Sequence, residues 1–381
     1  MTIKLYDNNS YMTEFEAIVI ACEQTKKGYK IELDQTAFFP EEGGQCCDRG
    51  TLDGENVTYV ELCGDTIYHY TDIPFEAGKT VHGKIDFELR YINMQNHSGE
   101  HVISGLSHNL YGCENVGFHL GDGYVTMDLD KPLNAEQLSL IEKKANEIIY
   151  QNVPITAEYP DKQQLSQINY RAKLDLSENV RIVSIGDMDK CACCAPHVAT
   201  TGEIGIIKIL DAINYKGGVR LNILCGSLAV LDYGERFKRN VEISNLLSAK
   251  QPEVVDAVKK LIEDNIALKQ KINSIYSALA KSIVDSTNES DGNICVFCEG
   301  LPAEYLRSVA PELALKCKGV AIALTGNDTE GYKYSIAIND GDISPFVKQA
   351  NESLNGRGGG RGNIASGSFN ATKEEIEKYF N

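Results

Sequence analysis

The sequence predicts an α+β protein built from several domains, and three observations carry that prediction. Its 381 residues exceed the roughly 100–200 residues of one ordinary domain. Short alternating segments fill the first part of the chain, and longer helical periodicities follow. A regular apolar seam then runs through one segment of the second half. We expect an N-terminal β-barrel at residues 1–87, an α/β domain at 88–235, a helical connector at 236–287 and a C-terminal α/β domain at 288–381.

Composition narrows the class of protein. Hydrophobic residues at 43% and charged residues at 24% are ordinary for a globular chain, which excludes a disordered or collagen-like protein. The net charge of −17 makes the surface negative on average, which does not favour a nucleic-acid partner. No apolar run reaches the ~18 residues of a membrane span, and the N-terminus lacks the apolar core of a signal peptide. We therefore expect a cytoplasmic protein without membrane contact, in which the 12 cysteines stay reduced.

The first two domains follow from periodicity. Alternating residues between glycine and aspartate turns predict barrel strands at 16–22, 29–33 and 56–62. From residue 88 helical spacing takes over, and a second amphipathic helix is predicted at 134–151. Further strands are predicted near residues 181–185, 205–211 and 218–224, which makes this region a mixed α/β layer.

The connector carries a heptad seam. Between Pro252, where a helix can begin, and residue 286, apolar residues recur at spacings of four and three, with Asn265 in one core position. Two readings stay open here: a helix that pairs with a second copy of the chain, and a long helix that packs on its own chain. A linker at 288–292 follows, and then strands at 294–298, 319–324 and 333–338.

Two separated segments together suggest a metal site. His97 and His101 stand at i and i+4, so on a helix both imidazoles lie on the same face. A second segment, from Cys191 to His197, is rich in thiols. Cys193 and His197 would complete a three-histidine, one-cysteine set that suits tetrahedral zinc.

Alternatives to that ligand set exist. Cys191 or Cys194 could replace Cys193, because spacing alone does not choose among neighbouring thiols, and His108 is a weaker candidate on the same stripe as His101. Each group could also be ordinary packing. The segment from His97 to His101 also fits H-x-x-E-H, the zinc-peptidase motif in which Glu100 would be the general base. That reading needs a downstream acidic ligand and leaves the cysteines unused.

Several segments together resemble the editing domains of alanyl-tRNA synthetases. The stretch from Thr36 to Gln45, with Asp48 and Gly50 after it, resembles their T-x-F-x-P-x-x-G-G-Q-x-x-D-x-G segment. Residues 95–101 resemble Q-x-H-(S/T)-x-x-H, and residues 193–205 resemble C-G-G-T-H followed by T-G-E-I-G. The departure is Cys194-Ala195-Pro196, where the synthetases carry Gly-Gly-Thr.

The resemblance continues to the C-terminus. Residues 356–367 resemble the glycine-rich motif of the DHH-associated domain with which alanyl-tRNA synthetases end. No aminoacylation module precedes residue 1, so the chain resembles the long form of the free-standing AlaX-type editing proteins. This resemblance implies hydrolysis of the ester that joins serine, or glycine, to tRNA(Ala), with one zinc ion per chain.

The resemblance also implies roles for residues. A synthetic pocket sized for alanine rejects serine only modestly, so a second site must recognise the serine hydroxyl, and by family analogy Thr36 reads it. Gly43, Gly44 and Gln45 would bring backbone N–H groups and an amide close to the substrate. Because four protein ligands close a zinc site, zinc would orient the aminoacyl end rather than make hydroxide.

The C-terminal motif suggests tRNA contact. Arg357 and Arg361 would grip phosphate, while Gly358 and Gly359 would form an anion-binding backbone nest. A weaker basic strip contains Lys208, Lys216, Arg220, Arg236, Lys238 and Arg239. We expect tRNA(Ala) charged with serine or glycine as the partner, and a homodimer formed through the connector or the C-terminal domain. The non-enzymatic alternative is a tRNA-binding module with a structural zinc.

Overall fold

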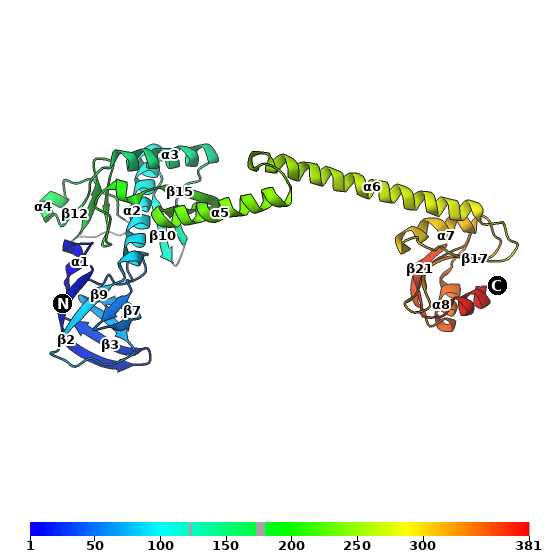
Figure 1. Ribbon diagram of the computed structural model, residues 1–381, viewed down its shortest axis with the longest axis horizontal. Coiled ribbons are helices and arrows are strands. Elements are labelled where there is room, and N and C mark those ends of the chain that lie inside the picture. Colours follow the sequence, from blue (N-terminus) through cyan, green and yellow to red (C-terminus); the bar gives the residue numbers. More distant parts are fainter. Residues whose placement is uncertain (122–123, 173–179, 381) are drawn as a thin grey trace. The chain divides into compact units, whose positions relative to one another are not determined.

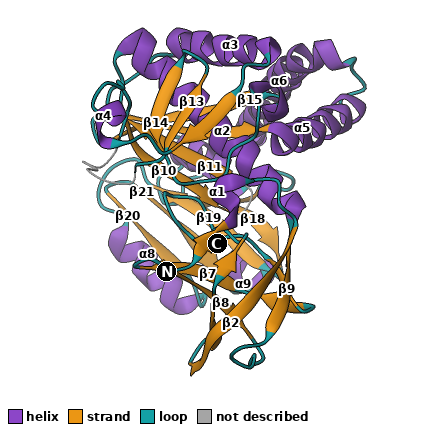
Figure 2. Ribbon diagram, turned by 90° about the vertical axis from the view of Figure 1, so that its left-hand side faces the viewer, coloured by secondary structure: helices purple, strands orange, loops and turns teal. Residues whose placement is uncertain are grey.

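The computed structural model describes residues 1–121, 124–172 and 180–380. The chain packs as two compact units, Met1–Asn240 and Val241–Asn381. Both units contain helices and strands, which confirms the predicted α+β class (Figures 1 and 2). The finer division into four domains stays a prediction. Its boundary after residue 235 falls inside helix α5 (Gly226–Leu246), close to the point where the two units meet in the chain.

The N-terminal part of unit 1 is a seven-stranded antiparallel sheet that curls into a nearly closed barrel. Its strand order is β6-β5-β9-β2-β3-β8-β7. The bounds are β2 (Glu14–Thr25), β3 (Gly28–Leu33), β5 (Gly50–Leu52), β6 (Glu55–Val57), β7 (Tyr59–Cys63), β8 (Thr66–Thr71) and β9 (Thr80–Ile85). Strands β6 and β7 stand at opposite ends of this order, yet only Thr58 separates them in the chain. The sheet must therefore wrap around its own interior, which Ile31, Leu33 and Phe38 fill.

One predicted barrel strand is divided. The single strand expected at residues 56–62 is divided into two strands, β6 and β7, which form opposite edges of the sheet. The hydrogen-bonded ladder is interrupted between them at Thr58. The expected strands at 16–22 and 29–33 are confirmed as β2 and β3. Short elements at the barrel mouth complete this part: β1 (Ile3–Lys4), α1 (Leu5–Asn8) and β4 (Gln35–Thr36), with β1 and β4 paired in parallel.

Helix α2 (Phe87–Tyr111) is the central element of unit 1. Asp86 caps its N-terminus by accepting a hydrogen bond from the Leu89 backbone N–H, and Gly112 ends it in the left-handed conformation. Most of its side chains from Asn93 to Ser107 are buried. The helix lies between the barrel strands and α3 (Ala135–Gln151) (Figure 1). Position 99 must be glycine, since a Cβ there would stand 2.2 Å from Cys225 Sγ.

Two further sheets surround α2. A four-stranded antiparallel sheet has the order β10-β11-β16-β15, and a three-stranded one has the order β12-β13-β14. The bounds are β10 (Asn115–Gly121), β11 (Tyr124–Leu129), β12 (Ile155–Glu158), β13 (Ile182–Ile185), β14 (Asp189–Ala192), β15 (Ile207–Tyr215) and β16 (Gly218–Cys225), with α4 (Lys162–Leu165) and η1 (Thr201–Ile204) between them. The predicted amphipathic helix is confirmed as α3, which Asn134 and Gln137 start with a capping box.

Unit 2 begins in the last turns of α5 and contains the predicted long helix and a mixed five-stranded sheet. Helix α6 (Val254–Ser286) follows a short turn, η2 (Gln251–Glu253), that contains Pro252. The sheet order is β17-β18-β19-β21-β20, and the β17–β18 pair is parallel. The bounds are β17 (Ile294–Phe297), η3 (Ala303–Tyr305), α7 (Leu306–Ala314), β18 (Ala321–Asn327), β19 (Gly331–Ala337), α8 (Ser344–Ser353), β20 (Arg357–Arg361), β21 (Ile364–Phe369) and α9 (Lys373–Phe380). The three strands predicted here are confirmed as β17, β18 and β19.

Among the described residues, no helix combines the length and the apolar character that a membrane-spanning helix requires.

Candidate metal centre

Four predicted ligands meet at one point of unit 1. Helix α2 supplies His97 and His101, and the loop after β14 supplies Cys193 and His197. Their ligand atoms all lie within 4.8 Å of one another, and Cys193 Sγ stands 3.5 Å from His97 Nε2 and 3.3 Å from His197 Nε2. The three imidazoles are buried. The structure thus brings the two halves of the sequence motif together, and Cys193 is the thiol within this group.

This group fits a tetrahedral metal ion by its chemistry and spacing. Ligands at ~2.0–2.3 Å from a tetrahedral zinc ion stand roughly 3.3–3.7 Å apart, which the two sulfur–nitrogen distances match. Burial lowers the pKa of His197 well below its ordinary value, and the neighbouring His101 and His97 lower it further. A neutral imidazole is the form that binds a metal. These residues could therefore hold a zinc ion.

Hydrogen bonds around the ligands orient their rings. His97 Nδ1 lies 2.7 Å from the Gln45 amide oxygen, so Nδ1 carries the proton and Nε2 faces the thiol. Ser98 Oγ lies 3.0 Å from His197 Nδ1 and leaves that ring's Nε2 toward Cys193. On the remaining side, Asp189 Oδ2 stands 3.9 Å from His101 Nδ1. Two 2.7 Å hydrogen bonds from Arg171 fix that carboxylate.

A cavity of about 460 Å³ opens beside the ligands, a volume suited to a small organic group. Residues from the barrel loop, α2, β10 and the cysteine loop line it, among them Glu42, Gly43, His97, Glu100, His101, Phe118, Cys193 and Cys194. Lys4, Tyr159, Arg171 and Arg181 lie on the same wall or its rim. The ligand group therefore faces a hollow that a substrate can enter.

The four residues predicted to contact substrate are not all placed there. Gly43 lines the cavity with its backbone in the left-handed region at φ +64°. Gly44 instead packs against β10, because its carbonyl accepts a 2.8 Å hydrogen bond from Leu120 N–H and a Cβ would stand 2.3 Å from the Phe118 oxygen. Gln45 is fully buried and serves His97 rather than the cavity wall.

Thr36 lies inside the barrel and does not line the cavity. It is fully buried, and its hydroxyl stands 2.8 Å from His69 Nε2. The same oxygen accepts a hydrogen bond from Phe38 N–H. The structure therefore gives the Thr36 hydroxyl internal partners, and its predicted contact with a serine substrate stays a prediction.

Glu100 is buried beside the ligands. Ser104 and Asn115 both donate hydrogen bonds to its Oε1, and its Oε2 stands 3.9 Å from His101 Nε2. The peptidase interpretation needs this carboxylate but leaves the cysteines unused. Since Cys193 stands within the ligand group, the arrangement does not match that interpretation.

Several residues of the site carried no recognisable sequence signal. Glu42, Ser98, Asn115 and the Arg171–Asp189 pair are ordinary polar residues scattered along the chain, and only the fold brings them to the ligands. The sequence indicates Glu100 only as part of a peptidase motif. Its nearness to His101 in the sequence was the one signal available.

The glycine-rich C-terminal segment is an edge strand, so the predicted anion nest is wrong. Gly358 and Gly359 belong to β20, which pairs with β21, and neither has the positive φ on which a nest depends. A Cβ at Gly358 would stand 2.5 Å from Gly367 Cα, so close sheet pairing accounts for that glycine. Arg357 and Arg361 are both exposed and, four residues apart on a strand, project on the same face.

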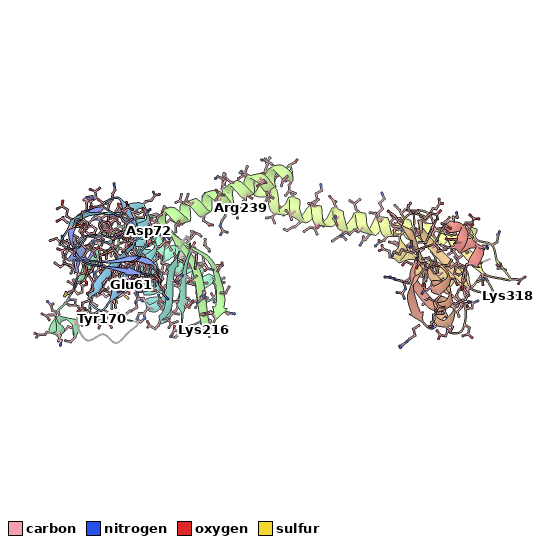
Figure 3. All side chains as sticks on the ribbon, turned by 90° about the horizontal axis from the view of Figure 1, so that it is seen from below. Glu61, Asp72, Tyr170, Lys216, Arg239 and Lys318 are labelled. Carbon is pink, nitrogen blue, oxygen red and sulfur yellow. The ribbon has the colours of Figure 1, made fainter. Side chains whose placement is uncertain are left out.

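The weaker basic strip is mostly neutralised by ion pairs. Four of its six cations pair with a neighbouring acid: Lys208 with Glu142, Arg220 with Asp128, Arg236 with Asp232 and Lys238 with Glu235. Figure 3 shows the other two, Lys216 at the β15–β16 turn and Arg239 on α5, projecting from separate elements. This strip therefore offers little positive charge to a nucleic acid.

Comparisons with known proteins identify the family of this chain. Residues 180–222 match the family described as threonyl and alanyl tRNA synthetase second additional domain. The chain is 26% identical to the alanyl-tRNA editing protein AlaX-L of Pyrococcus horikoshii, over 99% of this chain and 96% of that protein. It is 30% identical to the alanyl-tRNA editing protein Aarsd1 of Bos taurus, over 74% of this chain and 68% of that protein.

A longer enzyme is also similar. The alanine–tRNA ligase of Pyrococcus furiosus is 30% identical over 99% of this chain, but the match spans only 43% of the ligase. The likeness to the editing proteins, by contrast, extends over most of both chains. The matched family segment contains Cys193 and His197, and α2 carries the other two ligands. On this evidence the chain belongs to the family of alanyl-tRNA editing proteins.

Proposed function

We propose that this chain hydrolyses the ester bond of tRNA(Ala) mischarged with serine, and that it does so as a free-standing deacylase in the cytoplasm. One observation carries the proposal: in a chain of this family, His97, His101, Cys193 and His197 meet at the wall of a cavity sized for an aminoacyl group. The relatives are alanyl-tRNA editing proteins, which supports tRNA(Ala) as the carrier, and serine follows from the resemblance of the sequence segments. Glycine is a second substrate to be tested beside serine.

The proposed site holds one zinc ion per chain on those four side chains. When bound, zinc would help to orient the aminoacyl end rather than make hydroxide, since four protein ligands leave no open tetrahedral position. Gln45 and Ser98 keep the imidazoles turned to that ion. Gly43 presents backbone instead of a side chain to the cavity, which leaves room for the ester.

Glu100 has the geometry to position the attacking water. Its Oε1 is held by Ser104 and Asn115, so Oε2 is directed toward the ligand atoms and can accept a hydrogen bond there. Glu100 and the three imidazoles are buried, and a fixed carboxylate orients water more effectively where bulk solvent is excluded.

Contacts outside the site are proposed to come from unit 2. Arg357 and Arg361 would hold tRNA phosphates from the exposed face of β20.

Helix α6 would pair with α6 of a second copy, because its apolar residues Leu261, Leu268, Ile272 and Ile275 are exposed. Sedimentation of a variant that ends at Ser248 tests this pairing: it should be monomeric, and a dimer of that variant would exclude α6 as the contact.

The central experiment measures deacylation of seryl-, glycyl- and alanyl-tRNA(Ala) side by side, with zinc content determined on the same sample. We expect rapid loss of serine and retention of alanine. His97→Ala and Cys193→Ala should lose both zinc and activity, since each removes a ligand. His108→Ala is the matched control, because His108 lies on the same helix but is exposed and bonds to Glu114.

Two outcomes would contradict the proposal. Full deacylation by the zinc-free His97→Ala/Cys193→Ala variant would exclude the metal mechanism. Binding of tRNA(Ala) by the intact chain without any change in the deacylation rate would instead show a binding module whose zinc is structural.

A further inference from the structure

Glu42 is a cavity residue to which neither the sequence motifs nor the proposed reaction gives a role. It precedes Gly43 in the barrel loop, and both residues line the cavity beside Cys193 and Cys194. A Cβ built on Gly43 would lie 3.6 Å from Cys194 Sγ, so this loop and the cysteine loop are in contact. Glu42 therefore stands next to the metal-ligand group, on the side of the cavity that the barrel supplies.

The carboxylate of Glu42 has an unused acceptor. The Cys194 thiol hydrogen-bonds to this carboxylate, but the buried Oε2 atom accepts no hydrogen bond from any residue that the structure describes. The Tyr6 hydroxyl is buried without a partner under the same condition. Burial is the main cause that raises the pKa of Tyr6, and the charges of Asp7 and Glu42 raise it further. Two buried polar atoms thus lack the hydrogen bonds that buried groups normally make.

The other charged groups of the cavity, apart from Lys4, already have partners. Glu100 accepts from Ser104 and Asn115, and Glu114 stands 2.7 Å from His108. Arg171 pairs with Asp189, and Arg181 donates to the Cys193 and Ala195 carbonyls. Lys4 lines the cavity, but within residues 1–121, 124–172 and 180–380 no ion pair joins it to Glu42. Glu42 is therefore the cavity carboxylate with capacity for a cation.

We propose that Glu42 binds the α-ammonium group of the aminoacyl ester. This inference rests on the proposed function. An aminoacyl ester carries one cation, its α-ammonium group, which has three N–H donors and no acceptor. Glu42 Oε2 supplies an acceptor in the cavity that the metal ligands His97, His101 and Cys193 also line, where the ester would lie. A charge-assisted hydrogen bond in a buried site is among the stronger polar contacts. The cavity then recognises a free amino group.

The test compares two substrates that differ only at that group, seryl-tRNA(Ala) and N-acetyl-seryl-tRNA(Ala). The intact chain should deacylate the free-amine substrate about 10- to 100-fold faster in kcat/KM, the range expected from one hydrogen bond to a charged group. Glu42→Gln should slow the free-amine substrate by a similar factor. It should leave the acetylated one within about threefold, so the preference for a free amine collapses. Glu42→Ala should do the same.

Glu41→Gln is the matched control. Glu41 is the preceding residue of the same loop, but its carboxylate accepts a hydrogen bond from the Tyr59 hydroxyl. It is therefore not the proposed partner of the ammonium group. This variant should keep both zinc and the preference for the free amine. Zinc content and thermal unfolding of each Glu42 variant show whether the site is intact, and Glu42→Gln retains the shape of the side chain if Glu42→Ala folds poorly.

The outcomes separate the two claims. If the intact chain deacylates neither substrate, the proposed function fails. If it deacylates seryl-tRNA(Ala) and Glu42→Gln preserves the preference for the free amine, the assignment of Glu42 fails while the function stands. A variant that slows both substrates equally would also overturn the assignment, because the loss would then be independent of the ammonium group.

Discussion

The orientation of His97 depends on a single neighbouring amide. Gln45 is fully buried, and its oxygen accepts the 2.7 Å hydrogen bond from His97 Nδ1. We expect Gln45→Leu to weaken zinc binding by roughly 10- to 100-fold, the usual cost of removing a partner that orients a ligating histidine. Competition with a chromogenic chelator measures the zinc affinity directly.

Gln45→Glu is the informative companion to that variant. It keeps an acceptor for His97 Nδ1, so its zinc affinity should stay closer to that of the unchanged chain. Equal zinc affinity in Gln45→Leu and the unchanged chain would show that the histidine ring is held by packing alone.

At the same scale, the residues that could be predicted were those with a distinctive type and spacing. His97 and His101 follow from the i, i+4 rule, and His197 from the thiol-rich segment. Spacing could not select Cys193 over Cys191 and Cys194, because adjacent residues differ only in the direction that the backbone gives them. Glu42 could not be predicted either, since a glutamate in a loop acquires its meaning only from the cavity that the fold builds around it.

At the scale of an element, strand β8 places His69 in the barrel interior. Burial lowers the pKa of this imidazole from 6.5 to about 4. The unfolded chain therefore binds a proton below pH 6.5, whereas the folded chain does so only near pH 4. The stability that His69 contributes is present above pH 6.5 and is lost as the pH falls toward 4, by up to about 3 kcal/mol.

The variant that tests this removes both members of the buried pair. Thr36→Val with His69→Phe removes the Thr36 hydroxyl and His69 Nε2 together, because these two groups bond to each other. The Phe38 N–H and the Ile31 carbonyl each lose one partner at both pH values, so this cost does not change with pH. Urea unfolding at pH 7.5 and pH 5 should show a smaller acid-induced loss of stability in the double variant than in the unchanged chain. Identical losses would mean that His69 does not contribute to the acid sensitivity.

Helices and strands could be predicted where a single periodicity runs through a segment. They were harder to predict where barrel closure or strand pairing also determines the local structure. Helices α3 and α6 carry uninterrupted helical spacing, and both form as expected. The stretch at 56–62 reads as one strand, but barrel closure divides it at Thr58. The segment from Arg357 to Arg361 resembles a glycine loop, yet pairing with β21 extends it, because glycine tolerates close strand contact as readily as a turn.

At the scale of the whole molecule, the net charge of −17 is the sum over two compact units, and it does not show where positive charge is concentrated. Ion pairs occupy most of the basic strip in unit 1. In unit 2, Arg357 and Arg361 are exposed, and Lys348 lines a hollow beside the glycines of β20. In the proposed function, Arg357, Arg361 and Lys348 would contact tRNA phosphates, so we expect tRNA binding to be local and moderately sensitive to salt.

That grouping predicts a measurable slope. Each neutralised phosphate changes the logarithm of the binding constant by ~0.7–0.9 per unit of log salt, so three contacts give a slope of roughly −2 to −3. Arg357→Ala and Arg361→Ala should each reduce its magnitude by about one, because each variant removes one phosphate contact. Lys216→Ala, at the exposed β15–β16 turn of unit 1, is the control and should leave the slope unchanged. A slope steeper than about −6 would require many more contacts than β20 and its neighbours supply, and would place tRNA across a much larger surface of an acidic chain.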